Sequence, residues 1–139
     1  MPIVTELVER HFATLFENNA QWQTLIADDV IWYLPYAPAI AHPSRLTGRA
    51  EVTGHLDKFL EAAQNFRFHD LEIQPFADGA GAVAEVRATA FFKPTGRHYQ
   101  QNYVVLIWVR DGKISLIREY FDPIRAAKAL DTAIVGLVD

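Results

Sequence analysis

The chain lacks cysteine altogether, which excludes disulfides, thiolate catalysis and cysteine-ligated zinc. It also lacks a basic character. Its 13 Lys and Arg against 17 Asp and Glu give a formal net charge of −4, and the basic residues are scattered, so we expect no nucleic-acid partner. The longest wholly apolar run, 103–109, is too short to cross a bilayer, and the first ten residues lack a signal-peptide core. We therefore expect no membrane partner and a cytoplasmic location.

Apolar residues, in contrast, are abundant in the sequence. Of the 139 residues 50% are hydrophobic and 12% aromatic, enough to pack an interior and also to line a cavity. The length is that of one ordinary domain. We expect a single domain over residues 1–139.

The first half of the chain has helical periodicity. Apolar residues at helical spacing predict helices over 4–16 and 21–26, and a third helix that begins after Gly48. A short buried strand is expected at 30–34. The following stretch, 35–48, contains three prolines, which indicates a long loop of the kind that often forms a lid.

The second half alternates with period two, and glycine-containing turns separate the alternating segments. These patterns predict strands over 66–76, 82–92, 98–110 and 114–121, followed by a terminal helix over 124–138. A chain in which the helices come first and a meander of strands follows is typical of an α+β domain with its helices on one sheet face. The row Ala82, Ala84, Val86, Ala88 and Ala90 leaves room above that face for a helix or a ligand.

Glu119 is the sharpest candidate for chemistry. Strand alternation puts it on the face of Ile117 and Phe121, among apolar neighbours. A carboxyl group in such surroundings either finds a cation or becomes harder to ionise, and the second outcome makes a proton shuttle near neutral pH. The alternative is that Glu119 faces solvent or pairs with an arginine.

His55 and His11 each lie on an otherwise apolar helical face. Each is either a core residue satisfied by a local hydrogen bond or a member of one pocket on which the two helices converge. Asn102 shares a strand face with Val104, Leu106 and Trp108, where it either donates to a ligand carbonyl or satisfies a backbone group. The candidate substrate-binding residues are therefore His11, Trp32, Tyr36, Phe59, Asn102 and Trp108.

Metal and cofactor motifs are missing. The five histidines have neither His-x-His nor His-x-x-x-His spacing, and no phosphate-binding glycine loop, serine elbow or dinucleotide fingerprint is found. We expect no metal and no cofactor.

Four segments carry a family resemblance: 16–19 (FENN), 25–32 (LIADDVIW), 46–51 (LTGRAE) and 111–123, which ends in Arg-Glu-Tyr-Phe-Asp-Pro. With these the chain resembles the nuclear transport factor 2-like superfamily, which includes SnoaL-like cyclases and ketosteroid isomerases. The resemblance implies a cystatin-like α+β fold, in which a cone-shaped, curved, mostly antiparallel (mixed) sheet packs on N-terminal helices and encloses a pocket. It also implies a homodimer formed through the open sheet face.

Within that superfamily the chain is most similar to the phenazine-biosynthesis A/B-type proteins, through 99–103 (YQQNY) and the last hairpin. The similarity implies that Glu119 and His55 are catalytic and that no cofactor takes part. The ketosteroid isomerase pattern fits less well, because its general-base aspartate falls on Leu34 and its oxyanion-hole tyrosine on His11. A leucine cannot abstract a proton.

The leading hypothesis is thus a cofactor-independent acid/base enzyme that acts on a small, largely apolar, carbonyl-containing molecule. An isomerase, cyclase, dehydratase or condensation catalyst would fit. Glu119 would move the proton with His55 as its partner, while Asn102 or His11 polarised the carbonyl. The alternative is a non-catalytic module of the same fold that binds a small ligand or supports assembly. A metal-dependent hydrolase would require the histidines to converge on a cation.

Overall fold

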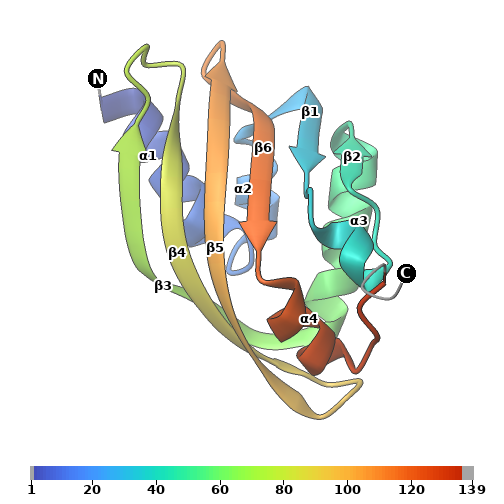
Figure 1. Cartoon of the computed structure of the whole chain (residues 1–139). Coiled ribbons are helices and arrows are strands. Elements are labelled where there is room, and N and C mark those ends of the chain that lie inside the picture. Colours follow the sequence, from blue (N-terminus) through green and yellow to red (C-terminus); the bar gives the residue numbers. More distant parts are fainter. Residues whose placement is uncertain (1, 136–139) are drawn as a thin grey trace.

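A curved six-stranded sheet with helices on one face forms the body of the protein (Figure 1). The computed structural model describes residues 2–135. The sheet order is β2-β1-β6-β5-β4-β3, and every neighbouring pair is antiparallel except β1 and β6. The strands are β1 (Ile26–Tyr33), β2 (Arg45–Thr47), β3 (Ala63–Pro75), β4 (Gly81–Phe92), β5 (Arg97–Arg110) and β6 (Lys113–Phe121). The α+β class with a mixed, curved sheet is confirmed.

Helices α1 (Pro2–Thr14), α2 (Asn19–Trp22) and α3 (Arg49–Ala62) lie behind the sheet in Figure 1. Helix α1 packs against β3 and β4, and α3 against β1 and β2. A 3-10 turn, η1 (Ala37–Ile40), connects β1 to β2. Helix α4 (Pro123–Leu130) follows β6 directly and packs against β5 and η1. These helices leave the opposite sheet face largely uncovered.

Several sequence predictions need correction. The helix predicted over 21–26 is the shorter α2, and β1 begins at Ile26 rather than at residue 30. The segment 35–48 is not loop throughout, because it contains η1 and the edge strand β2, which pairs with β1. The terminal helix ends at Leu130 rather than at 138, where Asp131 adopts a left-handed conformation (φ 53°) that stops it. Residues 136–139 of that predicted helix lie outside the described part of the chain.

The small-residue row of β4 lies on the concave face, with Ala82, Ala84, Val86, Ala88 and Ala90 all buried. Gly81 begins this strand, and its partner β5 passes so close that a Cβ there would meet the Ile107 carbonyl oxygen at 2.1 Å. Only glycine fits that position. Because these side chains are small, large side chains from β3 and the helices can pack close to the backbones of β4 and β5.

Arg49 joins the first residue of α3 to the segment around α2. Its guanidinium donates to the carbonyl oxygens of Gln23 at 2.6 Å and Ile26 at 2.7 Å, and it pairs with Asp28 at 3.3 Å. Such charge-assisted bonds to backbone carbonyls fix where α3 starts over the sheet. Among residues 2–135, no helix is long and apolar enough to cross a membrane.

Candidate active site

A cavity of about 430 Å³ is enclosed by the concave sheet face, α3, α4 and the segment that connects β1 to α3. Its volume is typical of small-molecule sites. Most lining side chains are apolar, and the 35–48 segment contributes Ala37, Ile40, Pro43 and Leu46. Such a lining suits an apolar molecule that presents few polar groups.

Six lining side chains carry a titratable group: His42, His55, Lys58, Tyr99, Tyr103 and Glu119. They come from two sides. The two histidines and the lysine lie on the β1–β2 connection and on α3, and the imidazole rings of His42 and His55 are perpendicular with centroids 6.1 Å apart. The tyrosines and the glutamate come from the sheet. A molecule in the cavity would lie between a basic side and a hydroxyl and carboxyl side.

Glu119 faces the cavity from the middle of the sheet. Its backbone is opposite Val105 on β5, which makes Tyr103 a diagonal neighbour on the same face. Among the described residues, no hydrogen bond or ion pair reaches the carboxyl group. Burial without a compensating partner raises the pKa of Glu119 from 4.5 to about 8. At pH 7 the neutral acid therefore predominates by about ten to one.

His55 lines the same cavity from α3. Its pKa is lowered, first by burial and then by the nearby charges of His42 and Lys58, so at neutral pH it is an uncharged base. The sequence hypothesis makes His55 the partner of Glu119, but the structure has no hydrogen bond between these two side chains, although both line the cavity. The two groups face one cavity from different sides. Any proton transfer between them has to pass through a bound molecule or water.

Tyr99 and Tyr103 form a hydroxyl pair that the sequence prediction of site residues did not include. Their hydroxyl oxygens are 3.0 Å apart, and the Gln101 amide nitrogen donates to Tyr99 at 3.0 Å. Burial, above all, raises the pKa of both phenols, and the charge of Glu119 raises both further. At neutral pH they are proton-bearing donors beside the carboxyl group.

Trp32 and Phe59 are candidates that do line the cavity. Trp32 is buried on β1, and its indole N–H has no partner in the described structure. Phe59 on α3 packs edge-on against Phe66 and Phe92. Both contribute apolar wall to the site.

Asn102 and Trp108 do not face the cavity, which corrects the prediction. Successive side chains of a strand point to opposite faces, and on β5 the buried row is Gln101, Tyr103, Val105 and Ile107. Asn102 is exposed on the other face. Trp108 also lies there, where the Arg118 guanidinium stacks 5.1 Å from its ring. Neither can touch a molecule in the cavity.

His11 and Tyr36 also lie outside the cavity lining. His11 is completely buried, and its Nδ1 accepts the Trp22 indole N–H at 2.9 Å. Burial lowers its pKa to about 3, so it is a neutral core residue. Tyr36 is 50% exposed and packs against the Tyr120 ring on the outside of the sheet. Polarising a substrate carbonyl is therefore not a role for His11.

Metal ligands are not gathered anywhere in residues 2–135, where no group of three or more His, Cys, Asp or Glu side chains could hold an ion. Leu34, at the position of the ketosteroid isomerase base, is an apolar part of the cavity wall. The titratable groups around the cavity are thus Glu119, the two tyrosines, His42, His55 and Lys58. Proton transfer and hydrogen bonding are the chemistry that these groups supply.

Comparison with known proteins agrees with this architecture. Residues 8–117 match the family model of the SnoaL-like domain. The chain is 30% identical over 122 residues to a PhzA/B-like protein of Pseudomonas aeruginosa, covering 86% of this chain and 85% of that protein.

Two solved structures have the same fold. A Bacillus subtilis protein described as a proposed isomerase superposes with a TM-score of 0.85 at 24% identity, and the match covers 96% of each chain. A phenazine biosynthesis-related protein of Pseudomonas aeruginosa superposes with a TM-score of 0.81 at 16% identity, over 97% of this chain and 85% of that one. At these identities the superpositions establish the fold and not the reaction.

Proposed function

The chain belongs to the SnoaL-like domain family, and from that premise we propose that its cavity is a cofactor-independent acid/base active site for a small, largely apolar molecule that carries a carbonyl group. One observation carries the proposal. Glu119 is an unpaired carboxyl group on an apolar cavity wall, with its pKa raised to about 8. A group that titrates near neutral pH can both take up and release a proton during a reaction.

The proposed reaction moves a proton on the carbon skeleton of the substrate. The Glu119 carboxylate takes a proton from a carbon next to the carbonyl, the C–H electron pair forms a carbon–carbon double bond, and the carbonyl oxygen gains the negative charge. In a substrate with a β,γ double bond, the neutral Glu119 then returns the proton to the γ carbon, the double bond moves into conjugation with the carbonyl, and the isomerisation is complete. Attack of the enolate carbon on a second carbonyl would instead form a carbon–carbon bond, with the proton of Glu119 passing to the new alkoxide, which gives a condensation or cyclisation. In a substrate with a β-hydroxyl group, the proton of Glu119 would pass to that hydroxyl, which leaves as water in a dehydration.

His55 is the proposed second proton-transfer group. Its lowered pKa keeps the imidazole uncharged at neutral pH. The uncharged ring can therefore accept a proton that leaves the substrate and is not held by Glu119. Pairs of groups whose surroundings shift their pKa values in opposite directions are typical of acid/base sites. The names of two similar proteins, a proposed isomerase and a phenazine biosynthesis-related protein, support chemistry of this class.

A non-catalytic ligand-binding module of the same fold is the competing function. The observation that favours it is the absence of a hydrogen bond between Glu119 and His55, because a mostly apolar cavity without a connected proton path also suits simple binding. The two functions differ in whether Glu119 transfers protons. They make opposite predictions for one variant.

That variant is Glu119→Gln, tested by deuterium exchange. The protein is incubated in D₂O with a panel of small cyclic ketones, and deuterium at the carbons beside the carbonyl is followed by mass spectrometry. Glu119→Gln should slow the exchange by roughly 10²–10⁴. Glu85→Gln, which removes an exposed carboxyl group from β4, should leave it unchanged. If wild type binds the ketones without accelerating exchange, the binding module is the correct function.

We further propose that the protein forms a homodimer through the outer face of the sheet. That face exposes Val104 by 41% and Tyr36 by 50%, next to Leu106 and Trp108. Such a patch on a monomer favours association. Light scattering should give twice the chain mass for wild type, and Val104→Glu should shift the equilibrium to the monomer. Wild type that stays monomeric from micromolar to millimolar concentration would contradict the proposal.

A further inference from the structure

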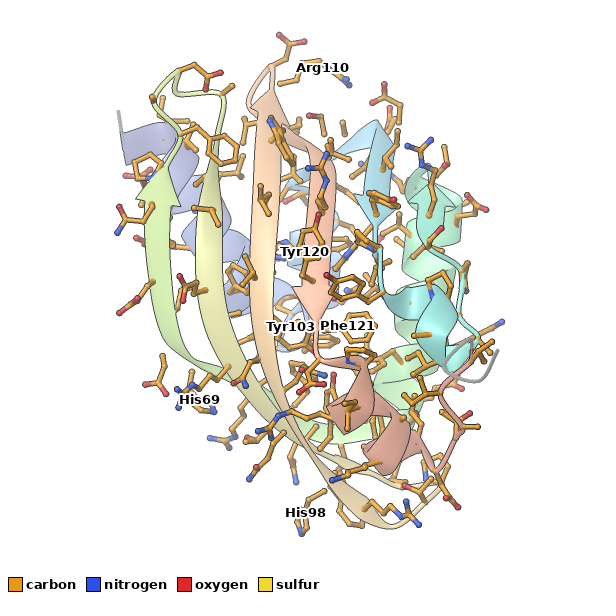
Figure 2. All side chains as sticks on the ribbon, viewed as in Figure 1. His69, His98, Tyr103, Arg110, Tyr120 and Phe121 are labelled. Carbon is orange, nitrogen blue, oxygen red and sulfur yellow. The ribbon has the colours of Figure 1, made fainter. Side chains whose placement is uncertain are left out.

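Three alternate residues of β5 carry polar groups on the concave face: Tyr99, Gln101 and Tyr103. All three are buried, with Gln101 only 1% exposed. Small residues lie opposite two of them on β4, because Tyr99 pairs with Ala90 and Gln101 with Ala88. On the other side of β5, Tyr103 pairs with Phe121, which lies at the end of β6 (Figure 2). The row therefore forms a polar strip on the concave sheet face, next to Glu119.

The Gln101 amide is held in one orientation by the backbone of Asp122. Its Oε1 accepts the Asp122 N–H at 2.8 Å, and its Nε2 donates to the Asp122 carbonyl oxygen at 3.0 Å. A backbone N–H can only donate and a carbonyl can only accept, so the amide cannot be flipped. Its second N–H must point to the Tyr99 hydroxyl. The clamp thus makes the Tyr99 oxygen an acceptor.

This acceptor role leaves the hydrogen of the Tyr99 hydroxyl available for the next bond of the chain. The Tyr99 and Tyr103 oxygens are 3.0 Å apart, and either hydroxyl can be the donor. Donation by Tyr99 pairs its hydrogen as well as its oxygen, which already accepts from Gln101. In that arrangement the Tyr99 hydroxyl donates once and accepts once, and successive bonds in one direction strengthen one another. The hydrogen of Tyr103 is left without a protein partner among the described residues, and Tyr103 lines the cavity. The chain ends in a donor that is free for a bound molecule.

We propose that the Tyr103 hydroxyl is the group that binds the substrate's carbonyl oxygen and stabilises the charge that develops on it, and that Tyr99 and Gln101 are positioning residues that direct its hydrogen. The inference rests on the proposed function, since it places the carbonyl within the same cavity. A fixed donor on a buried side chain such as Tyr103 is well suited to a developing oxyanion. Glu119 is the diagonal neighbour of Tyr103 on β6, so the carbon beside a carbonyl held by Tyr103 lies on the side of the proton-transfer group. Burial keeps both phenols protonated, as a donor must be.

Two probes of matched shape test the inference without any need for turnover. 2-Acetylnaphthalene carries a carbonyl acceptor and no donor, and 2-ethylnaphthalene has nearly the same shape without oxygen. Binding of each is measured by fluorescence for wild type, Tyr103→Phe, Tyr99→Phe and Glu119→Gln. The infrared carbonyl stretch of the bound ketone reports directly whether a donor reaches the oxygen.

The inference predicts that Tyr103→Phe weakens binding of the ketone about tenfold and changes binding of the hydrocarbon less than twofold. The carbonyl stretch should lie at lower frequency in wild type than in Tyr103→Phe. Tyr99→Phe should keep part of the frequency shift and cost about threefold in ketone affinity, because Tyr103 still donates but loses its polarising neighbour.

Several results would overturn it. Equal weakening of both probes by Tyr103→Phe would mean that Tyr103 only packs, and a larger effect of Tyr99→Phe would mean that the chain runs in the opposite direction. A frequency shift that disappears only in Glu119→Gln would assign the donor role to Glu119. If Tyr103→Phe does not fold, an unshifted carbonyl stretch in wild type alone refutes the inference. Wild type that binds neither probe would contradict the proposed function itself, whereas binding of both probes without any preference would contradict only the role of Tyr103.

Discussion

Replacing Glu119 by Gln should stabilise the protein by an amount that depends on pH. The folded chain holds Glu119 with a pKa of about 8, against 4.5 for the free side chain. Because the folded pKa is the higher one, the folded state keeps a proton that the unfolded state releases. Stability from this group is complete below pH 4.5 and is lost as the pH rises through 8. Gln carries no titrating proton and escapes this loss.

The magnitude follows from the two pKa values. The cost of Glu119 to the free energy of unfolding is about 0.8 kcal/mol at pH 5 and about 4 kcal/mol at pH 8, with 1.36 kcal/mol for each pKa unit. The advantage of Glu119→Gln over wild type should therefore grow by about 3.5 kcal/mol between these pH values. For a chain of 139 residues this corresponds to roughly 10 °C in melting temperature.

Thermal and urea unfolding of both proteins at pH 5 and pH 8 measure the effect. Any constant effect of the amide cancels in the difference between the two pH values, and so do all other titrating groups. Glu85→Gln, from the exposed face of β4, controls for the loss of one carboxyl group from the sheet. A difference between Glu119→Gln and wild type that is the same at pH 5 and pH 8 would refute the argument that Glu119 is buried without a partner.

Two further predictions concern the core. His11 has its pKa lowered to about 3, so its titration alone should subtract about 3 kcal/mol of stability between pH 7 and pH 4, because the unfolded state takes up a proton that the folded state cannot. His11→Gln should remove that part of the acid sensitivity in urea unfolding, and an unchanged pH dependence would contradict the assignment. Gly81→Ala should destabilise the protein by about 3 kcal/mol or more, because its Cβ would meet the Ile107 carbonyl at 2.1 Å. Gly54→Ala, in α3 with nothing within 4 Å, should instead stabilise it by about 1 kcal/mol in the same assay.

The strands could be predicted from the sequence because their alternation is long and their turns are chemically explicit. The Asp111-Gly112 turn is an example, since both residues adopt positive φ (52° and 74°) and join β5 to β6 as expected. Strand β2 could not be predicted, because it has three residues and is recognisable only through its pairing with β1. Three residues are too few to show the alternation of apolar and polar side chains that predicts a strand.

The candidate site was only partly predictable, and β5 shows why. Both faces of that strand are apolar, with Val105 and Ile107 on the inside and Val104 and Leu106 on the outside. Alternation separates the two rows but does not say which row faces the cavity. The prediction chose the row of Asn102, and the structure places the other one inside.

The positions of the hydroxyl groups were beyond reach for a different reason. The orientation of Tyr99 depends on Gln101, and that of Gln101 on the backbone of Asp122, 21 residues further along the chain. A contact between residues so far apart in sequence is created by the fold. Glu119 was predictable because its surroundings are its own strand neighbours, Ile117 and Phe121, which face the same side.

The pH dependence of deuterium exchange tests the central claim, that Glu119 is a proton-transfer group in this cavity. A ketone that wild type exchanges in D₂O is followed from pH 5.5 to pH 9.5, with Glu119→Gln and Glu85→Gln measured alongside. The carboxylate is the base, so the rate should rise with pH and level off above about 8, where Glu119 is ionised. Glu85→Gln should give the same curve, and Glu119→Gln a rate lower by roughly 10²–10⁴ without the inflection near 8. A rate that keeps its inflection in Glu119→Gln, or that falls above pH 8 in wild type, would contradict this assignment.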